Sequence, residues 1–116
     1  MSADQSERTE VRHEVGPDGT HAVIVSGEVD IFNSELFEST LSEALSGGAV
    51  VIDLRDCRYV DSAAIAALIR FRKKNSGDVK IVVNGKGAVR RVLSVTRIDE
   101  IIPIESVTGT SGNSTT

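Results

Sequence analysis

Hydrophobic and polar residues alternate in two stretches near the start of the chain. Residues 9–15 (TEVRHEV) and residues 21–29 (HAVIVSGEV) both show the period of two that is typical of half-buried strands. Between them lies GPDG, whose proline, aspartate and glycine favour a tight turn. The pattern therefore predicts a β-hairpin, and this is the only antiparallel pair that it supports.

Three later segments carry apolar residues at helical spacing. The first runs from Phe32 to Leu45, and Gly47-Gly48 is expected to cap its end. The second starts at Asp61-Ser62 and ends in basic residues, and the third follows residue 87. The first helix has Leu36, Phe37, Leu41, Ala44 and Leu45 at helical spacing. The second is expected to face the core with Ile65, Leu68 and Ile69, and the third has Val89, Val92, Leu93 and Thr96 on one side.

Short apolar segments separate these helices. AVVIDL and VKIVVN are apolar at both odd and even positions, which indicates strands buried on both faces. EIIPI (100–104) predicts a last strand, and Pro103 places it at an edge. The order β-β-α-β-α-β-α-β predicts an α/β fold with a mixed, mostly parallel sheet and three helices. We expect a single domain over residues 10–105, with disordered polar ends at 1–9 and 106–116.

Composition narrows the function. The chain has a net charge of -4, one tyrosine, three phenylalanines and no tryptophan, which disfavours nucleic acid as a direct partner. No apolar run approaches the ~20 residues of a membrane-spanning helix, and the polar start has no signal-peptide pattern. We therefore expect a cytoplasmic protein without membrane insertion. Cys57 is predicted to pack in the core, and His13 and His21 to face solvent, with no metal or cofactor bound.

Candidate functional residues follow two of the predicted strands. Asp30 ends the segment VSGEVD, and Asp61 and Ser62 begin the second helix. If the two strands are parallel, all three residues lie at one edge of the sheet. Ser62 has two interpretations. It is either the N-cap of the helix, shared with Asp61, or a phosphate acceptor at a helix start that tolerates negative charge.

The second helix also offers a contact surface. Ala63, Ala66 and Ala67 lie off its core-facing stripe, so they form a flat apolar patch beside Ser62 or are simply good helix formers. Catalysis by Ser62 is not expected, because no base is indicated nearby and the Gly-x-Ser-x-Gly motif is missing. We therefore predict that the protein is not an enzyme. Its partner-binding surface is expected to consist of Asp30, Asp61, Ser62, Ala63 and Ala66.

The segment VIDLRDCRYVDSAAIAAL resembles the signature of STAS domains of anti-sigma factor antagonists. VSGEVD is similar to the Gly-Glu-Leu-Asp segment of that family, and GAVRRVLSVTRIDEIIPI to its third helix and last strand. The resemblance covers residues 10–105. It implies that Ser62 is phosphorylated by an anti-sigma factor serine kinase of the GHKL type, and that Asp30 helps to form the partner-binding edge.

The same resemblance implies a partner switch. The unphosphorylated protein binds the anti-sigma factor and frees the sigma factor, and a PP2C-type phosphatase resets the phosphorylated form. Ala64 and Ala66 stand where the family usually has glycines. Together with Ala63, they favour an alternative, in which an unphosphorylated STAS scaffold or transporter-regulating module binds a protein through the same edge.

Overall fold

The computed structural model describes residues 9–45 and 48–108, and it contains the predicted order of strands and helices with one short 3-10 helix added. The elements are β1 (Glu10–Val15), β2 (His21–Val29), α1 (Ser34–Glu43), β3 (Val50–Val60), α2 (Ser62–Lys74), β4 (Val79–Asn84), α3 (Ala88–Val95), η2 (Ile98–Glu100) and β5 (Ile104–Val107). In this part of the chain, no helix is long and apolar enough to cross a membrane.

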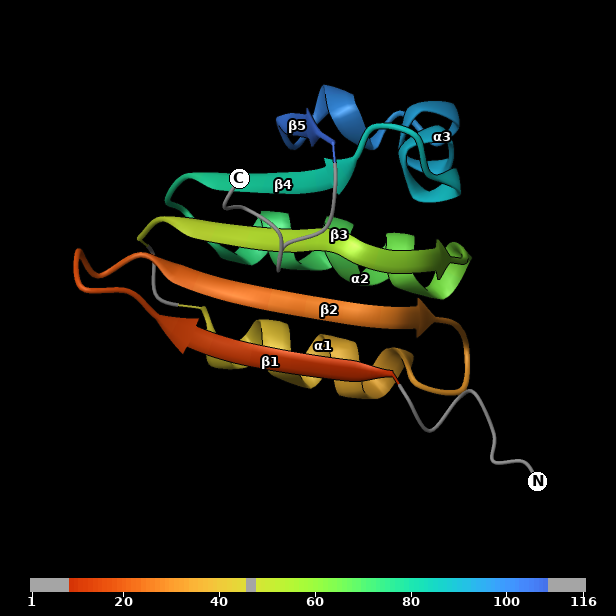
Figure 1. Cartoon of the computed structure of the whole chain (residues 1–116). Helices are drawn as coiled ribbons and strands as arrows, with labels where there is room; N and C mark the ends of the chain where they lie inside the picture. The colour runs from red at the N-terminus through yellow and green to blue at the C-terminus, as the bar shows by residue number, and fades with distance from the viewer. Residues whose placement is uncertain (1–8, 46–47, 109–116) are drawn as a thin grey trace.

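The strands form one mixed sheet in the order β1-β2-β3-β4-β5 (Figure 1). β1 and β2 pair antiparallel, which confirms the predicted hairpin, and every later neighbour pairs in parallel. At the carboxyl ends of β2 and β3, Val29 lies opposite Val60. The chain therefore leaves both strands at the same edge of the sheet, and this edge is called the rim below.

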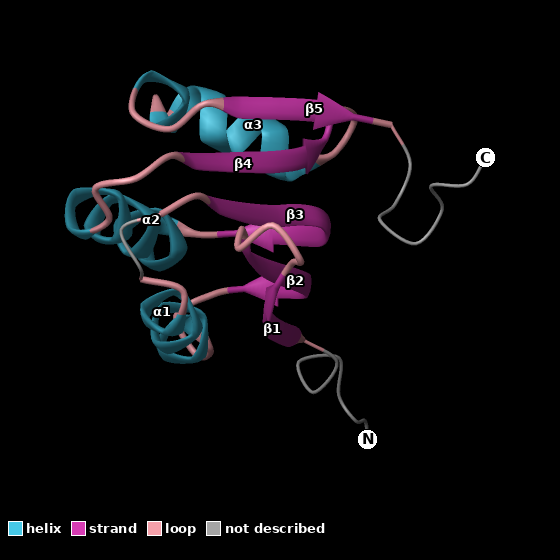
Figure 2. Ribbon diagram, turned by 90° about the vertical axis from the view of Figure 1, so that its left-hand side faces the viewer, coloured by secondary structure: helices cyan, strands magenta, loops and turns pink. Residues whose placement is uncertain are grey.

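Helices α1 and α2 lie side by side along one face of the sheet (Figure 2). Alternate residues of β2, β3 and β4 point into this layer and meet the apolar stripes of the helices. The fully buried side chains include Val23, Val25, Phe37, Leu41, Ile52, Leu54, Leu68 and Ile81. Burying each of them stabilises the fold by about 1.5–3 kcal/mol before entropy is counted. Helix α3 lies beyond the end of β4, beside the second half of β3 (Figure 1).

The predicted first helix is correct at its centre and wrong at both ends. It starts at Ser34, two residues after Phe32, and its C-cap is Ala44. The amide of Ala44 bonds to the carbonyl of Leu41, so the last turn tightens before the glycines are reached. Gly47, half of the predicted cap, lies outside the described residues. The two outer leucines of the predicted stripe, Leu36 and Leu45, are 45% and 40% exposed.

The last strand is at an edge as predicted, but it starts later. Residues 98–100 form η2, and β5 begins at Ile104, directly after Pro103. The carbonyl of Pro103 still accepts a hydrogen bond from the amide of Ile81, so proline ends the turn without breaking the sheet. Residues 106 and 107 belong to β5 and not to the predicted tail. The predicted disordered ends otherwise lie outside the described residues, apart from Thr9 and residue 108.

Cys57 is buried as predicted, but the histidines are not solvent-facing. The rings of His13 and His21 stack with centroids 5.0 Å apart, and a hydrogen bond of 2.8 Å joins Nε2 of His13 to Nδ1 of His21. Glu43 of α1 approaches His13 at 3.7 Å. Because antiparallel pairing places both rings on the side of α1, they are half-buried. They lie at the start of β2, away from the rim.

Candidate partner-docking site

The rim brings the predicted site residues together. Asp30 follows Val29 at the end of β2, and Asp61 and Ser62 follow β3. The amide of Asp61 donates a hydrogen bond of 3.1 Å to the carbonyl of Val29, which ties the two chain exits to each other. The expectation that Asp30 and Ser62 share one edge is therefore confirmed.

Asp61 is the N-cap of α2. Its backbone is extended, and its Oδ1 accepts hydrogen bonds from the amides of Ala63 at 2.9 Å and Ala64 at 3.3 Å. The interpretation of Ser62 as the cap is therefore wrong. Ser62 is the first residue of the helix and is exposed, and its hydroxyl makes no hydrogen bond within the described residues. The first turn itself contains no acidic residue, so Asp61 supplies the carboxylate at the positive end of the helix dipole beside this hydroxyl.

The chain between β2 and α1 forms a turn held by its own side chains. Oδ1 of Asp30 accepts hydrogen bonds from the amides of Phe32 at 3.0 Å and Asn33 at 3.3 Å. In return, Oδ1 of Asn33 accepts a bond of 2.8 Å from the amide of Asp30. The side chain of Asp30 therefore holds the conformation of this turn, and it is also an acidic group at the rim. Residues 30–33 are called the docking loop below.

The docking loop exposes two large apolar side chains that the sequence reasoning missed. Phe32 is 92% exposed and Ile31 is 68% exposed. The sequence pattern predicts a helix that begins at Phe32, whereas in the structure this residue lies in the loop before α1. Tyr59, near the end of β3, is also exposed. Exposed aromatic residues bordered by polar groups are typical of protein contact sites. The signal in the sequence was the apolar pair enclosed by two turn-forming residues, Asp30 and Asn33.

The predicted alanine patch is smaller than expected. Ala63 and Ala66 are half-buried, but Ala67 is buried at 1% exposure. Ala67 lies between the two helices, in a small crevice that Leu41 and Phe71 also line. The prediction failed for Ala67 because α2 packs against α1 as well as against the sheet, so its buried arc is wider than a single stripe.

A larger hollow of about 620 Å³ lies between β3 and the start of α3, with Arg55, Asp56, Cys57 and Arg58 in its lining. Burial raises the pKa of the Cys57 thiol to about 11. At neutral pH this thiol is protonated and is therefore a poor nucleophile. The hollow is separate from Ser62 and from the docking loop.

The sequence model of the STAS domain matches residues 14–110, so the chain belongs to the STAS domain family. A search of curated proteins gives no match. Similar solved structures include an anti-sigma factor antagonist from Mycobacterium paratuberculosis, which is 24% identical with a TM-score of 0.76. That alignment covers 92% of each chain.

Two other solved structures share this architecture. A candidate anti-sigma factor antagonist from Thermotoga maritima is 23% identical with a TM-score of 0.70, and the match covers 84% of this chain and 86% of that one. The antagonist SpoIIAA in its unphosphorylated form is 14% identical with a TM-score of 0.59, over 89% of this chain and 92% of that one. At these identities the likeness shows the STAS fold, as the sequence resemblance predicted.

Proposed function

We propose that this chain is an anti-sigma factor antagonist that is switched by phosphorylation of Ser62. In the unphosphorylated state, the docking loop and the first turn of α2 bind an anti-sigma factor kinase and thereby free the sigma factor. One observation carries the proposal: the Ser62 hydroxyl is exposed beside the docking loop, while Asp61 alone caps the helix. The structural similarity to anti-sigma factor antagonists supports the same role.

The geometry explains how phosphorylation acts in this proposal. A phosphoryl group adds about -1.5 to -2 charges at neutral pH, and the start of a helix tolerates them. On Ser62 these charges join Asp61 and Asp30 at the rim, the edge of the sheet that also carries the exposed Phe32. A partner surface complementary to apolar side chains is then repelled or forced to desolvate the phosphate. A PP2C-type phosphatase restores binding by removing the group.

Ala64 and Ala66, which stand where the family usually has glycines, do not restrict the access of a kinase to Ser62 equally. Ala64 is fully buried, so its methyl group points into the core and away from an approaching kinase. Only Ala63 and Ala66 present partly exposed methyl groups near Ser62. The alternative of an unphosphorylated scaffold or transporter regulator therefore depends mainly on Ala66. Stable binding to a transporter ATPase, without labelling of Ser62 by any kinase, would support that alternative.

Phosphoryl transfer tests the proposal directly. The protein is incubated with ATP and each purified GHKL-type anti-sigma factor kinase of the source organism, and labelling is followed by intact mass spectrometry. We expect one phosphoryl group on the wild type and on the control Ser76→Ala, which alters an exposed serine beyond the other end of α2. Ser62→Ala should remain unlabelled. Labelling of Ser62→Ala at the wild-type level, or equal kinase affinity before and after labelling, contradicts the proposal.

A further inference from the structure

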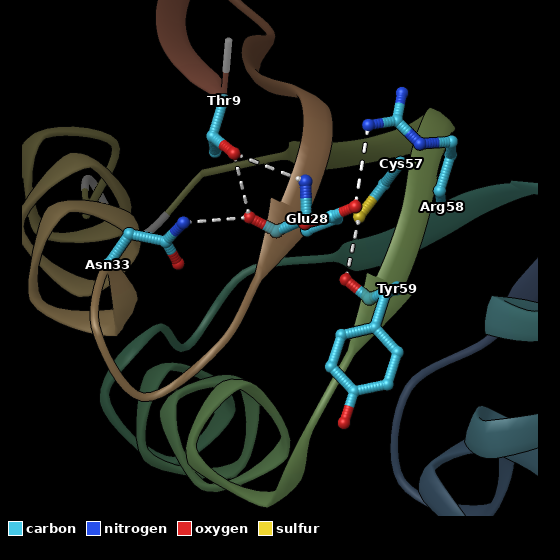
Figure 3. Close-up of polar contacts among 6 residues, drawn as sticks. All are labelled: Thr9, Glu28, Asn33, Cys57, Arg58 and Tyr59. Atoms are coloured by element: carbon cyan, nitrogen blue, oxygen red, sulfur yellow. Dashed lines mark hydrogen bonds and ion pairs between the residues drawn. The ribbon is translucent and has the colours of Figure 1, made fainter. Parts of the chain in front are cut away.

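Two side chains from distant parts of the chain converge on the carbonyl oxygen of Glu28 (Figure 3). The hydroxyl of Thr9, just before β1, donates a hydrogen bond of 3.2 Å to this oxygen. Nδ2 of Asn33, in the docking loop, donates another of 2.9 Å. The Thr9 hydroxyl also accepts a bond of 3.3 Å from the Glu28 amide. Both backbone groups of Glu28 are therefore bound to Thr9.

The preceding glycine allows Thr9 to come this close. Gly27 has φ +98°, and a Cβ at this position would lie 2.8 Å from Oγ1 of Thr9 and 2.9 Å from its Cα. The pairing of β2 with β3 also shifts register between Gly27 and Glu28, where β3 contains one extra residue. Any larger residue at position 27 would displace Thr9 from Glu28.

The hydrogen bonds continue from Glu28 to the backbone of Phe32, the most exposed residue of the docking loop. Asn33 binds the Asp30 amide, and Asp30 binds the Phe32 amide. Because Phe32 is 92% exposed, packing does not fix its position. Its backbone is held by this chain of bonds, whose far end is Thr9. A preorganised loop loses less conformational entropy when a partner binds.

We propose that Thr9 and Asn33 are positioning residues, which hold the docking loop in its binding conformation through the shared Glu28 carbonyl. The inference rests on the proposed function, because it assigns a role within the same docking site. Neither residue has to touch the partner. Thr9, the residue directly before β1, thereby controls how the loop presents Phe32.

The first test needs no partner. Thr9→Val removes the hydroxyl at nearly constant shape, and Thr9→Ser keeps it. Thr96→Val is the matched control, because the Thr96 hydroxyl bonds the Val92 carbonyl at 2.7 Å in a different part of the fold. Amide hydrogen exchange is measured by NMR at Phe32, Asn33 and the β4 amides. Loss of one hydrogen bond predicts exchange about tenfold faster at the two loop amides in Thr9→Val alone. Unchanged loop exchange, or equal acceleration in β4, overturns the inference.

The second test measures the affinity for the anti-sigma factor kinase identified by labelling. We expect Thr9→Val and Asn33→Ala to weaken binding about tenfold, and Thr9→Ser and Thr96→Val to bind like the wild type. Normal affinity of Thr9→Val despite faster loop exchange overturns the positioning role. If the wild type binds no such kinase, the proposed function fails. Loop exchange then still decides whether Thr9 holds the loop.

Discussion

The structure separates the roles of Asp61 and Ser62, and unfolding measurements can test this separation. Asp61→Ala removes the acceptor of two amide bonds, from Ala63 and Ala64. Loss of an N-cap costs about 1 kcal/mol, and loss of the charge at the helix start adds about 0.3–1 kcal/mol. The sum is about 1.5 kcal/mol, or a Tm lower by roughly 5–10 °C for a domain of this size. Ser62→Ala removes an exposed hydroxyl that makes no hydrogen bond to residues 9–45 or 48–108, and should stay within about 0.5 kcal/mol of the wild type.

Urea unfolding followed by far-UV circular dichroism measures both changes. Asp61→Asn serves as the control, because it keeps a side-chain oxygen for the amides and loses only the charge. Its stability should therefore lie between those of the wild type and Asp61→Ala. The reasoning is refuted if Ser62→Ala is destabilised as much as Asp61→Ala, since the serine would then be the cap. It is also refuted if Asp61→Ala unfolds like the wild type.

Three further measurements test other parts of the structure. Phe32→Ala should change the free energy of unfolding by less than about 0.5 kcal/mol. Phe37 is 0% exposed, so Phe37→Ala should lower this free energy by about 3–5 kcal/mol. Equal losses in urea unfolding would show that Phe32 is packed. The Cys57 thiol should react slowly with a disulfide reagent at pH 8 in the native protein and at once in denaturant, because its pKa is raised to about 11 by burial; fast native labelling would contradict this. Hydrogen bonds from Arg70 lower the pKa of Glu38. The ion pair therefore stabilises the fold at pH values above the usual glutamate pKa, and this stabilisation is lost as the pH falls through the lowered pKa. Glu38→Gln should therefore cause a small loss of Tm at pH 7 that disappears in acid, and a loss independent of pH would refute it.

The parts of the fold that sequence predicted are those with local signals. Alternation and the turn residues around Pro17 predicted the β1–β2 hairpin. An aspartate and a serine at the start of a helical pattern predicted where α2 begins, and the structure then chose Asp61 as the cap. Parallel pairing of β2 and β3 followed from the helix between them. Together these signals were enough to place Asp30 and Ser62 at one edge.

The features that sequence did not predict depend on contacts between distant residues. Phe32 was predicted to begin the first helix, but the bonds between Asp30 and Asn33 delay the helix to Ser34, and the side chain of Phe32 is exposed. Ala67 is buried only because α1 lies across it. The role of Thr9 depends on a hydrogen bond to a residue 19 positions later in the chain.

The geometry of the rim also indicates how the proposed switch works. The bonds that hold the docking loop join Thr9, Glu28, Asp30 and Asn33, and none of them involves Ser62. A phosphoryl group on Ser62 therefore leaves the loop in place, so its effect on a partner comes from charge and desolvation. Exposed charges are screened over about 8 Å at physiological salt. The ratio of affinities of the unphosphorylated and phosphorylated forms should thus shrink as salt rises, whereas a switch that unfolds the loop would keep this ratio constant.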